Sequence, residues 1–448
     1  MKLKRFKENT KKKIIVISFT VLCLLLIAGV YLYTSYAFYE ETKNFNVING
    51  TVEDPGDLYF AYYVDGKISR TMPSKNIGYT LDTTKSSCDN GVTVDWDYSK
   101  WKANIYYENY AATDNTRTKC TLYFNKTAKT VKTALGNIEV NSYKPDLTKS
   151  ACDTSNCESH EKGIFETTDA DGTSYYYRGA VENNYLKFAG YYWRVVRING
   201  NGSVRIIYDG TSAHANGESS TDRQYGTSQF NTNYNNNMYV GYMYTSGEAH
   251  GTGTSSTIKT NADKFYTDKL SSYASKLDTN AGFCGDRSNL NQQSGVGTGT
   301  VITYNKGYLR VVESAPTLTC ENASDYYTVA SASSGNKKLS YPIGLITADE
   351  VMLAGHAGGV FDGGFNHQKT NNGSYLVTGN SFWTMTPAGG YTPFGSTYWG
   401  AVVFFVNGSG FIDDFNAYDT YGLRPVVNLK SGVTITGSGT KTDPYVVS

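Results

Sequence analysis

Two histidines and an aspartate late in the sequence are of the types that hold transition metals. His356, Asp362 and His367 fall together in the run HAGGVFDGGFNHQ. Imidazole and carboxylate ligands suit zinc or another first-row metal. The run is rich in glycine and follows an expected helix, where exposed polar side chains are common in loops. The sequence favours an ordinary loop here, with metal binding as the alternative.

A second group of side chains could offer hard oxygen ligands to calcium. Asp413, Asp414, Asn416 and Asp419 lie within seven residues of one another. Calcium prefers such oxygens, but their spacing does not match an EF-hand loop. We therefore expect no metal and no cofactor, although calcium at Asp413–Asp419 stays open.

Signatures of common enzyme sites are absent from the sequence. It contains no G-x-S-x-G, no H-E-x-x-H, no phosphate-binding G-x-x-x-x-G-K-[ST] and no C-x-x-C. The glycine-rich run 295–299 follows polar residues instead of an apolar strand, so it is expected to be a flexible loop. The sequence predicts a non-catalytic protein, with an exported enzyme of unrecognised site as the weakest alternative.

Six cysteines lie beyond the apolar N-terminal run, in three local groups. Their clustering predicts the disulfides Cys88–Cys120, Cys152–Cys157 and Cys284–Cys320. An even number of paired cysteines is typical of an oxidising compartment. Zinc at Cys152, Cys157 and His160 is the alternative, but a second pair of ligands at short spacing is lacking.

The first residues predict a membrane anchor. Residues 1–13 carry seven cations against one acid, and an uncharged apolar run extends from Ile14 to Tyr33. Twenty helical residues span about 30 Å, the thickness of a bilayer core. A basic flank stays cytoplasmic. We therefore expect a single-pass signal anchor at 14–34 with the C-terminus extracellular at the cell membrane; a signal peptide cleaved after Ala37 remains the alternative.

The charge and composition of the rest agree with an extracellular location. Beyond residue 13 the chain carries 34 Lys and Arg against 39 Asp and Glu, and they form no basic patch. Nucleic-acid binding, which needs clustered cations, is therefore not expected. The 39 tyrosines and 45 glycines favour many short strands with polar turns.

The expected fold is mainly β with α+β elements. We predict a polar stalk at 35–56, a small β-sandwich at 57–127, a connector with a disulfide loop at 128–180 and an α+β domain at 181–448. In the sandwich, the run Leu58–Val64 precedes Asp65-Gly66, a pair suited to a tight hairpin turn. A disulfide between Cys88 and Cys120 would cross-link its strands.

The large domain opens with a predicted hairpin, Tyr191–Ile198 and Val204–Tyr208 around an Asn-Gly-Asn-Gly turn. Apolar spacing after a possible Asn261 cap predicts one helix, with Tyr266, Leu270, Tyr273 and Leu277 on its buried face. Thr347 and Glu350 form a capping-box pair that predicts a second helix. The expected closing strands are 375–377, 382–385, 401–406, 423–429 and 433–435.

Four motifs stand out in this domain. They are KFAGYYWRVVRINGNGSVRIIYDG (187–210), IGLITADEVMLAG (343–355), SFWTMTP (381–387) and the C-terminal run from YGLRPVVNL (421–447). Together they resemble a family of uncharacterised surface proteins of Gram-positive bacteria. The resemblance covers residues 128–448 and implies no established activity.

The C-terminal part has a Trp-bearing strand, a Gly-rich loop region and a closing G-L-R element, Gly422-Leu423-Arg424. With these features it is similar to the C-type-lectin or formylglycine-generating-enzyme fold. That likeness implies a lectin-like domain, but not the chemistry of either group. No cysteine follows Cys320, as the oxidising enzymes would require, and the calcium-binding triplets of lectins are absent. Fold alone does not supply function.

Recognition by loops is the function that the sequence favours. The region 386–421 carries aromatic side chains among Gly, Asn, Thr and Asp, a mixture suited to contacts with proteins or sugar faces. The expected ligand-binding residues are Tyr391, Phe394, Tyr398, Asn416, Tyr418 and Asp419. Trp399 and Tyr421 are expected in the core instead. The partners would be glycans or surface proteins; a passive envelope component is the alternative.

Overall fold

The computed structural model describes most of the chain beyond the N-terminal region. The described residues are 58–73, 79–97, 100–108, 117–126, 129–136, 139–148, 150–151, 161–290, 303–331, 333–356, 360–361, 364–365, 374–390 and 400–448. The expected anchor, the stalk and the Cys152–Cys157 loop lie outside them. Within these ranges, no helix is long and apolar enough to cross a bilayer.

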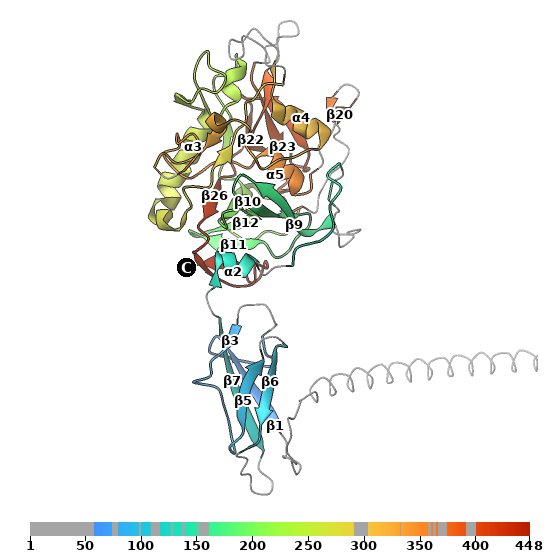
Figure 1. Ribbon diagram of the computed structural model, residues 1–448, viewed down its shortest axis with the longest axis vertical. Coiled ribbons are helices and arrows are strands. Elements are labelled where there is room, and N and C mark those ends of the chain that lie inside the picture. The colour runs from blue at the N-terminus through green and yellow to red at the C-terminus, as the bar shows by residue number, and fades with distance from the viewer. Residues whose placement is uncertain are drawn as a thin grey trace, which may run out of the picture. The chain divides into compact units, whose positions relative to one another are not determined.

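The chain is mainly β with few helices, as the sequence predicts, and it divides into two compact units. Among the described residues, the first unit extends to Asn125 and the second runs from Lys126 to Ser448. Figure 1 shows strands as the dominant elements of both units.

The smaller unit contains a five-stranded sheet and a separate hairpin. The sheet has the order β2-β1-β7-β3, with β4 also paired to β7, and β5 pairs with β6. The strands are β1 (Leu58–Val64), β2 (Lys67–Ser69), β3 (Tyr79–Leu81), β4 (Ser87–Cys88), β5 (Thr93–Asp97), β6 (Lys102–Tyr106) and β7 (Thr118–Lys126). Trp96 and Phe124 meet edge to face at 5.0 Å in the common core. Asp65 and Gly66 both have positive φ (50° and 76°), as the predicted hairpin turn requires.

A nine-stranded sheet forms one part of the larger unit. Its order is β26-β13-β12-β11-β28-β27-β8, with β10 on β12 and β9 on β10. The strands are β8 (Lys129–Thr130), β9 (Gly163–Asp169), β10 (Gly172–Arg178), β11 (Tyr185–Phe188), β12 (Tyr191–Ile198), β13 (Val204–Gly210), β26 (Val426–Leu429), β27 (Thr434–Thr436) and β28 (Tyr445–Val447). The predicted hairpin is confirmed as the antiparallel pair β12–β13.

A six-stranded sheet forms the other part. Its order is β14-β25-β22-β23-β24, with β18 on β22. The strands are β14 (Thr227–Gln229), β18 (Thr303–Tyr304), β22 (Phe382–Gly390), β23 (Val402–Val406), β24 (Ile412–Asn416) and β25 (Thr420–Gly422). Three short pairs complete the strands: β15 (Met243–Tyr244) with β16 (Thr254–Ser255), β17 (Phe283–Cys284) with β19 (Tyr326–Tyr327), and β20 (Val360–Phe361) with β21 (Gly364–Phe365).

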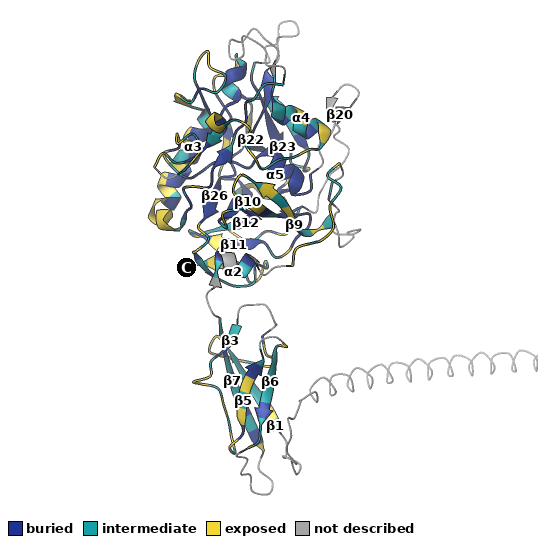
Figure 2. Ribbon diagram, in the orientation of Figure 1, coloured by how far each residue is buried: buried dark blue, intermediate teal, exposed yellow. Residues whose placement is uncertain are grey.

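Short helices flank these sheets. They are α2 (Val131–Gly136), α3 (Thr257–Phe265), α4 (Lys306–Glu313) and α5 (Ala348–Leu353). A π turn (Tyr266–Leu270) and a 3-10 turn (Ser271–Lys276) continue α3, and further 3-10 turns span 221–223, 237–240 and 323–325. Figure 1 shows α3 and α4 on opposite sides of β22 and β23. Figure 2 shows that β22, β23, β26 and α5 are buried throughout.

Two tryptophans anchor one continuous core in the larger unit. Trp193 of β12 and Trp383 of β22 are fully buried, and both belong to the same apolar cluster. Their indole nitrogens donate to the carbonyls of Phe188 at 3.0 Å and Ser228 at 2.8 Å. Each ring therefore fills the core without leaving a buried donor unpaired.

Three sequence expectations about elements need correction. Helix α3 begins earlier than predicted, because Ser256 is its N-cap and Asn261 lies inside it, with its amide donating to Ser228 Oγ at 2.8 Å. Tyr273 is 39% exposed instead of buried, since it lies in the 3-10 turn after α3. Residues 375–377 are buried but form no strand.

Candidate functional site

The described cysteines form the two disulfides that the sequence predicts. Cys88 and Cys120 are opposite residues of β4 and β7, with Cα atoms 4.0 Å apart. Cys284 of β17 is bonded to Cys320, which follows α4, with Cα atoms 5.4 Å apart. Each disulfide is therefore a structural cross-link between two segments of the same unit.

His356, a possible metal ligand, already forms hydrogen bonds through its side chain within the protein. His356 is 1% exposed, its Nδ1 lies 2.6 Å from Gly410 O and its Nε2 lies 2.9 Å from Ser374 Oγ. Burial lowers the pKa of His356 to about 4. Both ring nitrogens are engaged, so His356 has none free for a metal. Asp362 and His367 lie outside the described residues.

The acidic cluster 413–419 does not converge on one point. Asp413 and Asp414 are consecutive residues of β24, so their side chains leave opposite faces of the strand. Asp413 Oδ1 accepts the backbone N–H of Asp414 at 2.9 Å. Within the described part of the chain, no three His, Cys, Asp or Glu side chains are arranged to hold a metal.

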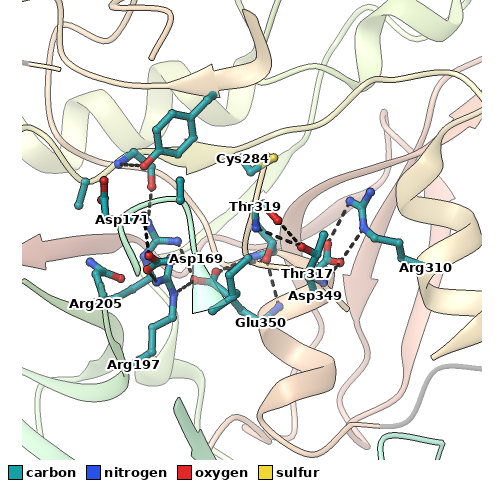
Figure 3. A pocket seen from close by; sticks show the side chains of 17 residues that line it. Asp169, Asp171, Arg197, Arg205, Cys284, Arg310, Thr317, Thr319, Asp349 and Glu350 are labelled. Atoms are coloured by element: carbon teal, nitrogen blue, oxygen red, sulfur yellow. Dashed lines mark hydrogen bonds and ion pairs between the residues drawn. The ribbon is translucent and has the colours of Figure 1, made fainter. Parts of the chain in front are cut away.

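A pocket of the larger unit is lined by ion pairs, and Figure 3 shows its charged side chains meeting from several elements. Glu350 Oε1 accepts from Arg197 Nε at 2.9 Å and from Arg205 Nη1 at 2.6 Å. Arg197 Nη1 also donates to Asp169 Oδ2 at 2.9 Å. Burial alone would raise the pKa of Glu350, but the charges of the two arginines outweigh it and lower that pKa to about 2. The carboxylate is therefore ionised at neutral pH.

The wall of the same pocket beside α4 is equally well paired. Arg310 donates to Asp349 Oδ1 at 2.7 Å and to Asp286 Oδ2 at 3.0 Å, and the backbone N–H of Thr317 donates to Asp349 at 3.1 Å. Only about 30 Å³ is open to the centres of water molecules, enough for water but not for a larger ligand. We conclude that the ion pairs lining this pocket stabilise the fold, and we call such a buried cluster of ion pairs a brace.

A second buried brace surrounds Asp209. Its Oδ1 accepts from Arg223 Nε at 2.9 Å and from Arg424 Nη2 at 3.0 Å, and Arg194 Nη1 lies 3.8 Å from its Oδ2. All three arginines are fully buried, and burial lowers the pKa of Arg424 to about 9. Arg424 belongs to the G-L-R motif of the sequence, which therefore has a role in packing.

A different surface lies where β23 begins and β24 ends. We call it the tyrosine–amide surface and define it by five residues: Asn231, Tyr234, Asn416, Tyr418 and Asp419. The rings of Tyr234 and Tyr418 lie 4.4 Å apart with an angle of 52° between their planes. Tyr234 is 37% exposed.

Backbone hydrogen bonds hold the two segments of this surface together. The N–H of Asn231 donates to Ala417 O at 2.9 Å, and the N–H of Ala401 donates to Tyr234 O at 2.7 Å. Gln229 Nε2 donates to Tyr418 O at 2.6 Å. A Cβ on Gly400 would lie 1.8 Å from Tyr234 O, so only glycine permits this close approach. The tyrosine–amide surface is therefore built on the six-stranded sheet.

The polar side chains of this surface are incompletely paired. A hydrogen bond joins Asn416 to Asp419. Asn416 Oδ1, Asp419 Oδ2 and Asn231 Nδ2 are buried and have no hydrogen-bond partner. Burial raises the pKa of Asp419, although the bond from Asn416 opposes this. Buried polar groups are normally paired, so three unpaired atoms on one small surface call for an explanation.

The expected ligand-binding residues are placed only in part. Asn416, Tyr418 and Asp419 lie together, whereas Tyr391, Phe394 and Tyr398 fall outside the described residues. The sequence did not indicate Asn231 or Tyr234. The run FNTNYNNN (230–237) was the available signal, because it repeats the mixture of aromatic and amide residues found at 386–421.

Tyr421 is part buried and packs against the core, close to the core position that the sequence predicts. Its ring stacks on Phe405 at 4.3 Å and meets Trp383 at 4.7 Å. Trp399 lies outside the described residues.

The chain was also compared with known proteins. No family model, no curated protein and no solved structure matches it.

Proposed function

We propose that this chain is a membrane-anchored extracellular protein whose larger unit is a non-catalytic binding module. The basic N-terminus beside an apolar run of bilayer length supports the anchor. Two disulfides support an oxidising compartment. The resemblance to surface proteins of Gram-positive bacteria supports the same location.

The tyrosine–amide surface carries the proposal of binding. The two ion-pair braces are buried among their own charged partners, and the pocket of the first leaves room only for water, so both suit stability. The tyrosine–amide surface instead presents Tyr234, which is 37% exposed, beside the ring of Tyr418. Rings beside amides are also common in recognition surfaces.

We also propose that the larger unit is a lectin-like α+β domain. The support is the likeness of the motifs SFWTMTP and G-L-R, which contribute Trp383 and Arg424 to the buried interior. Because fold does not determine function, the proposed binding rests on the surface alone.

An array of glycans and cell-surface proteins tests the proposed function. The full chain in detergent micelles would be applied with and without calcium, beside the double variant Tyr234→Ala, Tyr418→Ala. We expect at least one ligand whose binding weakens by roughly 2 kcal/mol or more in the variant, because a few aromatic residues dominate such sites. Circular dichroism would verify that the variant is folded.

Two outcomes would count against the proposal. Binding that survives the double substitution would place the site elsewhere. Binding to no member of the array would favour a passive component of the cell envelope.

A further inference from the structure

A polar cleft of the larger unit lies beside the turn that joins β26 to β27. About 750 Å³ of it is open to the centres of water molecules, so the cleft has the size of a small-ligand site. Its lining comes from residues 275–280, from residues 430–434 and from Asn201 in the turn between β12 and β13. None of these residues belongs to the tyrosine–amide surface. The cleft is therefore a separate candidate site.

Backbone hydrogen bonds hold the two walls of the cleft together. The N–H of Asp278 donates to Asn428 O at 2.7 Å, and the N–H of Lys430 donates to Lys276 O at 2.9 Å. Leu277, which lies between Lys276 and Asp278, is fully buried in the core. The walls are therefore fixed by the fold, and little ordering would be needed when a ligand binds.

A buried carboxylate fixes two asparagines of the lining. Asp278 is 6% exposed, and its Oδ2 accepts from Asn201 Nδ2 at 3.1 Å while its Oδ1 accepts the backbone N–H of Asn280 at 2.9 Å. Asn201 Oδ1 also accepts from the backbone N–H and the hydroxyl of Ser203, at 2.9 and 2.7 Å. Both asparagines are exposed. The cleft thus presents amide groups to solvent from a fixed backbone.

Two lysines bring ammonium groups to the same cleft. Lys430 Nζ donates to Ser275 O at 2.9 Å, and Lys276 Nζ donates to Ser448 O. An ammonium has three N–H donors, so one carbonyl does not exhaust either lysine. Lys430 is exposed and Lys276 is half-buried. Both can therefore donate to a ligand as well.

The charges around the cleft have both signs. Lys276 and Lys430 line it together with Asp278, and Asp171 lies close enough to Asp278 for the two carboxylates to interact. Burial and the negative charges of Asp169 and Asp278 raise the pKa of Asp171. Carboxylates repel an anion and ammonium groups repel a cation. A neutral ligand is therefore favoured.

The lining also selects the kind of neutral ligand. Amides and hydroxyls both donate and accept hydrogen bonds, whereas an ammonium only donates. An apolar ligand would bury these groups without partners. Neighbouring hydroxyls of a sugar can accept from an ammonium and pair with an amide at the same time. We propose that this cleft binds a neutral oligosaccharide, whose hydroxyl groups contact Asn201, Asn280 and Lys430.

Ligand-observed NMR on the full chain tests the proposal, in micelles of a detergent without a sugar headgroup. The neutral probes are short oligomers of glucose, galactose, mannose and N-acetylglucosamine. A galacturonic acid oligomer is the anionic probe, and triglycine is the zwitterionic probe. Saturation transfer would be titrated with each probe at low and at high salt.

The variants separate contacts in the cleft from general attraction. Asn280→Ala removes an exposed amide and keeps the backbone hydrogen bond to Asp278. Lys430→Ala removes an exposed ammonium of the cleft. Lys264→Ala removes an exposed ammonium of α3, outside the cleft, and is the matched control. Thermal melting of each variant would verify folding.

We expect at least one neutral oligosaccharide to bind, with little difference between low and high salt. Asn280→Ala should weaken its binding about fivefold and Lys430→Ala about tenfold, since hydrogen bonds to charged groups contribute more than neutral ones. Lys264→Ala and the double variant Tyr234→Ala, Tyr418→Ala should leave this binding unchanged.

Several results would overturn the inference. Binding of the galacturonic acid oligomer alone would show an anion site, and binding of triglycine alone would show a peptide site. Equal loss in Lys264→Ala and Lys430→Ala would show general attraction only. Loss in the double tyrosine variant, with none in Lys430→Ala, would refute the cleft and support the tyrosine–amide surface. Binding of none of the probes would refute the cleft and leave that surface to its own test.

Discussion

Glu350 of α5 is the side chain on which the larger ionic brace depends, and Glu350→Gln tests that role. The substitution keeps the shape of the side chain but removes the charge shared by Arg197 and Arg205, which stay buried. Both pairs have side chains at most 7% exposed. Removing one partner of a buried ion pair typically costs about 3–5 kcal/mol, because it leaves an uncompensated charge.

The pKa of Glu350 also gives the free energy by which its ionised carboxylate stabilises the folded protein. Its pKa falls from 4.5 to about 2 on folding. The ionised form is therefore favoured in the folded protein, and the stabilisation is fully present above pH 4.5. It is lost as the pH falls from 4.5 to about 2, and it amounts to about 3 kcal/mol.

Scanning calorimetry of the full chain checks this prediction. At neutral pH, Glu350→Gln should lower the transition of the larger unit by roughly 6–12 °C. The variant should also lose the part of the acid sensitivity that Glu350 contributes between pH 4.5 and 2. Glu313→Gln is the control, since it removes an exposed charge. A loss below about 1 kcal/mol in Glu350→Gln would refute the reasoning, because the brace would then not depend on this carboxylate.

Three further predictions concern other parts of the chain. Replacing Cys284 and Cys320 with Ser should cost about 2–4 kcal/mol, measured as a lower melting temperature, and free thiols at both positions in the exported protein would contradict the compartment. His356→Gln should remove a pH dependence of stability: burial lowers the pKa of His356 from 6.5 to about 4, so the stabilisation is present above pH 6.5 and is lost as the pH falls towards 4, which denaturant titrations would show. Protease added to intact cells should reach residues 35–448 but not 1–13, and a C-terminal reporter active only in the cytoplasm would overturn that topology.

Local patterns of the sequence were sufficient for the strands and turns. Apolar runs next to turn residues predicted β1 and the hairpin β12–β13, and Asp65-Gly66 predicted the turn after β1 because few residues tolerate positive φ. The capping box at Thr347 and Glu350 is confirmed as well. These features depend on neighbours in the sequence.

The ionic braces depend on distant residues, and the sequence did not predict them. Arg197 and Arg205 alternate with apolar residues on their strands, a pattern typical of a solvent-facing side. Instead, both are buried against Glu350, which comes from α5 much later in the chain. The start of α3 was missed although its signal is local, since Ser256 caps the helix by accepting the backbone N–H of Lys259.

The sequence indicated only one of the two segments that form the tyrosine–amide surface. Composition indicated Tyr418, Asn416 and Asp419, because aromatic and amide residues gather at 386–421. Their partner Tyr234 comes from a segment that pairs with them only through the fold. No local pattern reveals which polar atoms stay unpaired, since that depends on every neighbour in space.

Hydrogen exchange on the full chain tests the proposed binding surface most directly. Amide exchange would be compared with and without a saturating ligand from the array. We predict protection confined to residues 231–237 and 416–421, at the tyrosine–amide surface, and absent from Tyr234→Ala, Tyr418→Ala. Protection elsewhere in the larger unit, with these two segments unchanged, would contradict the account.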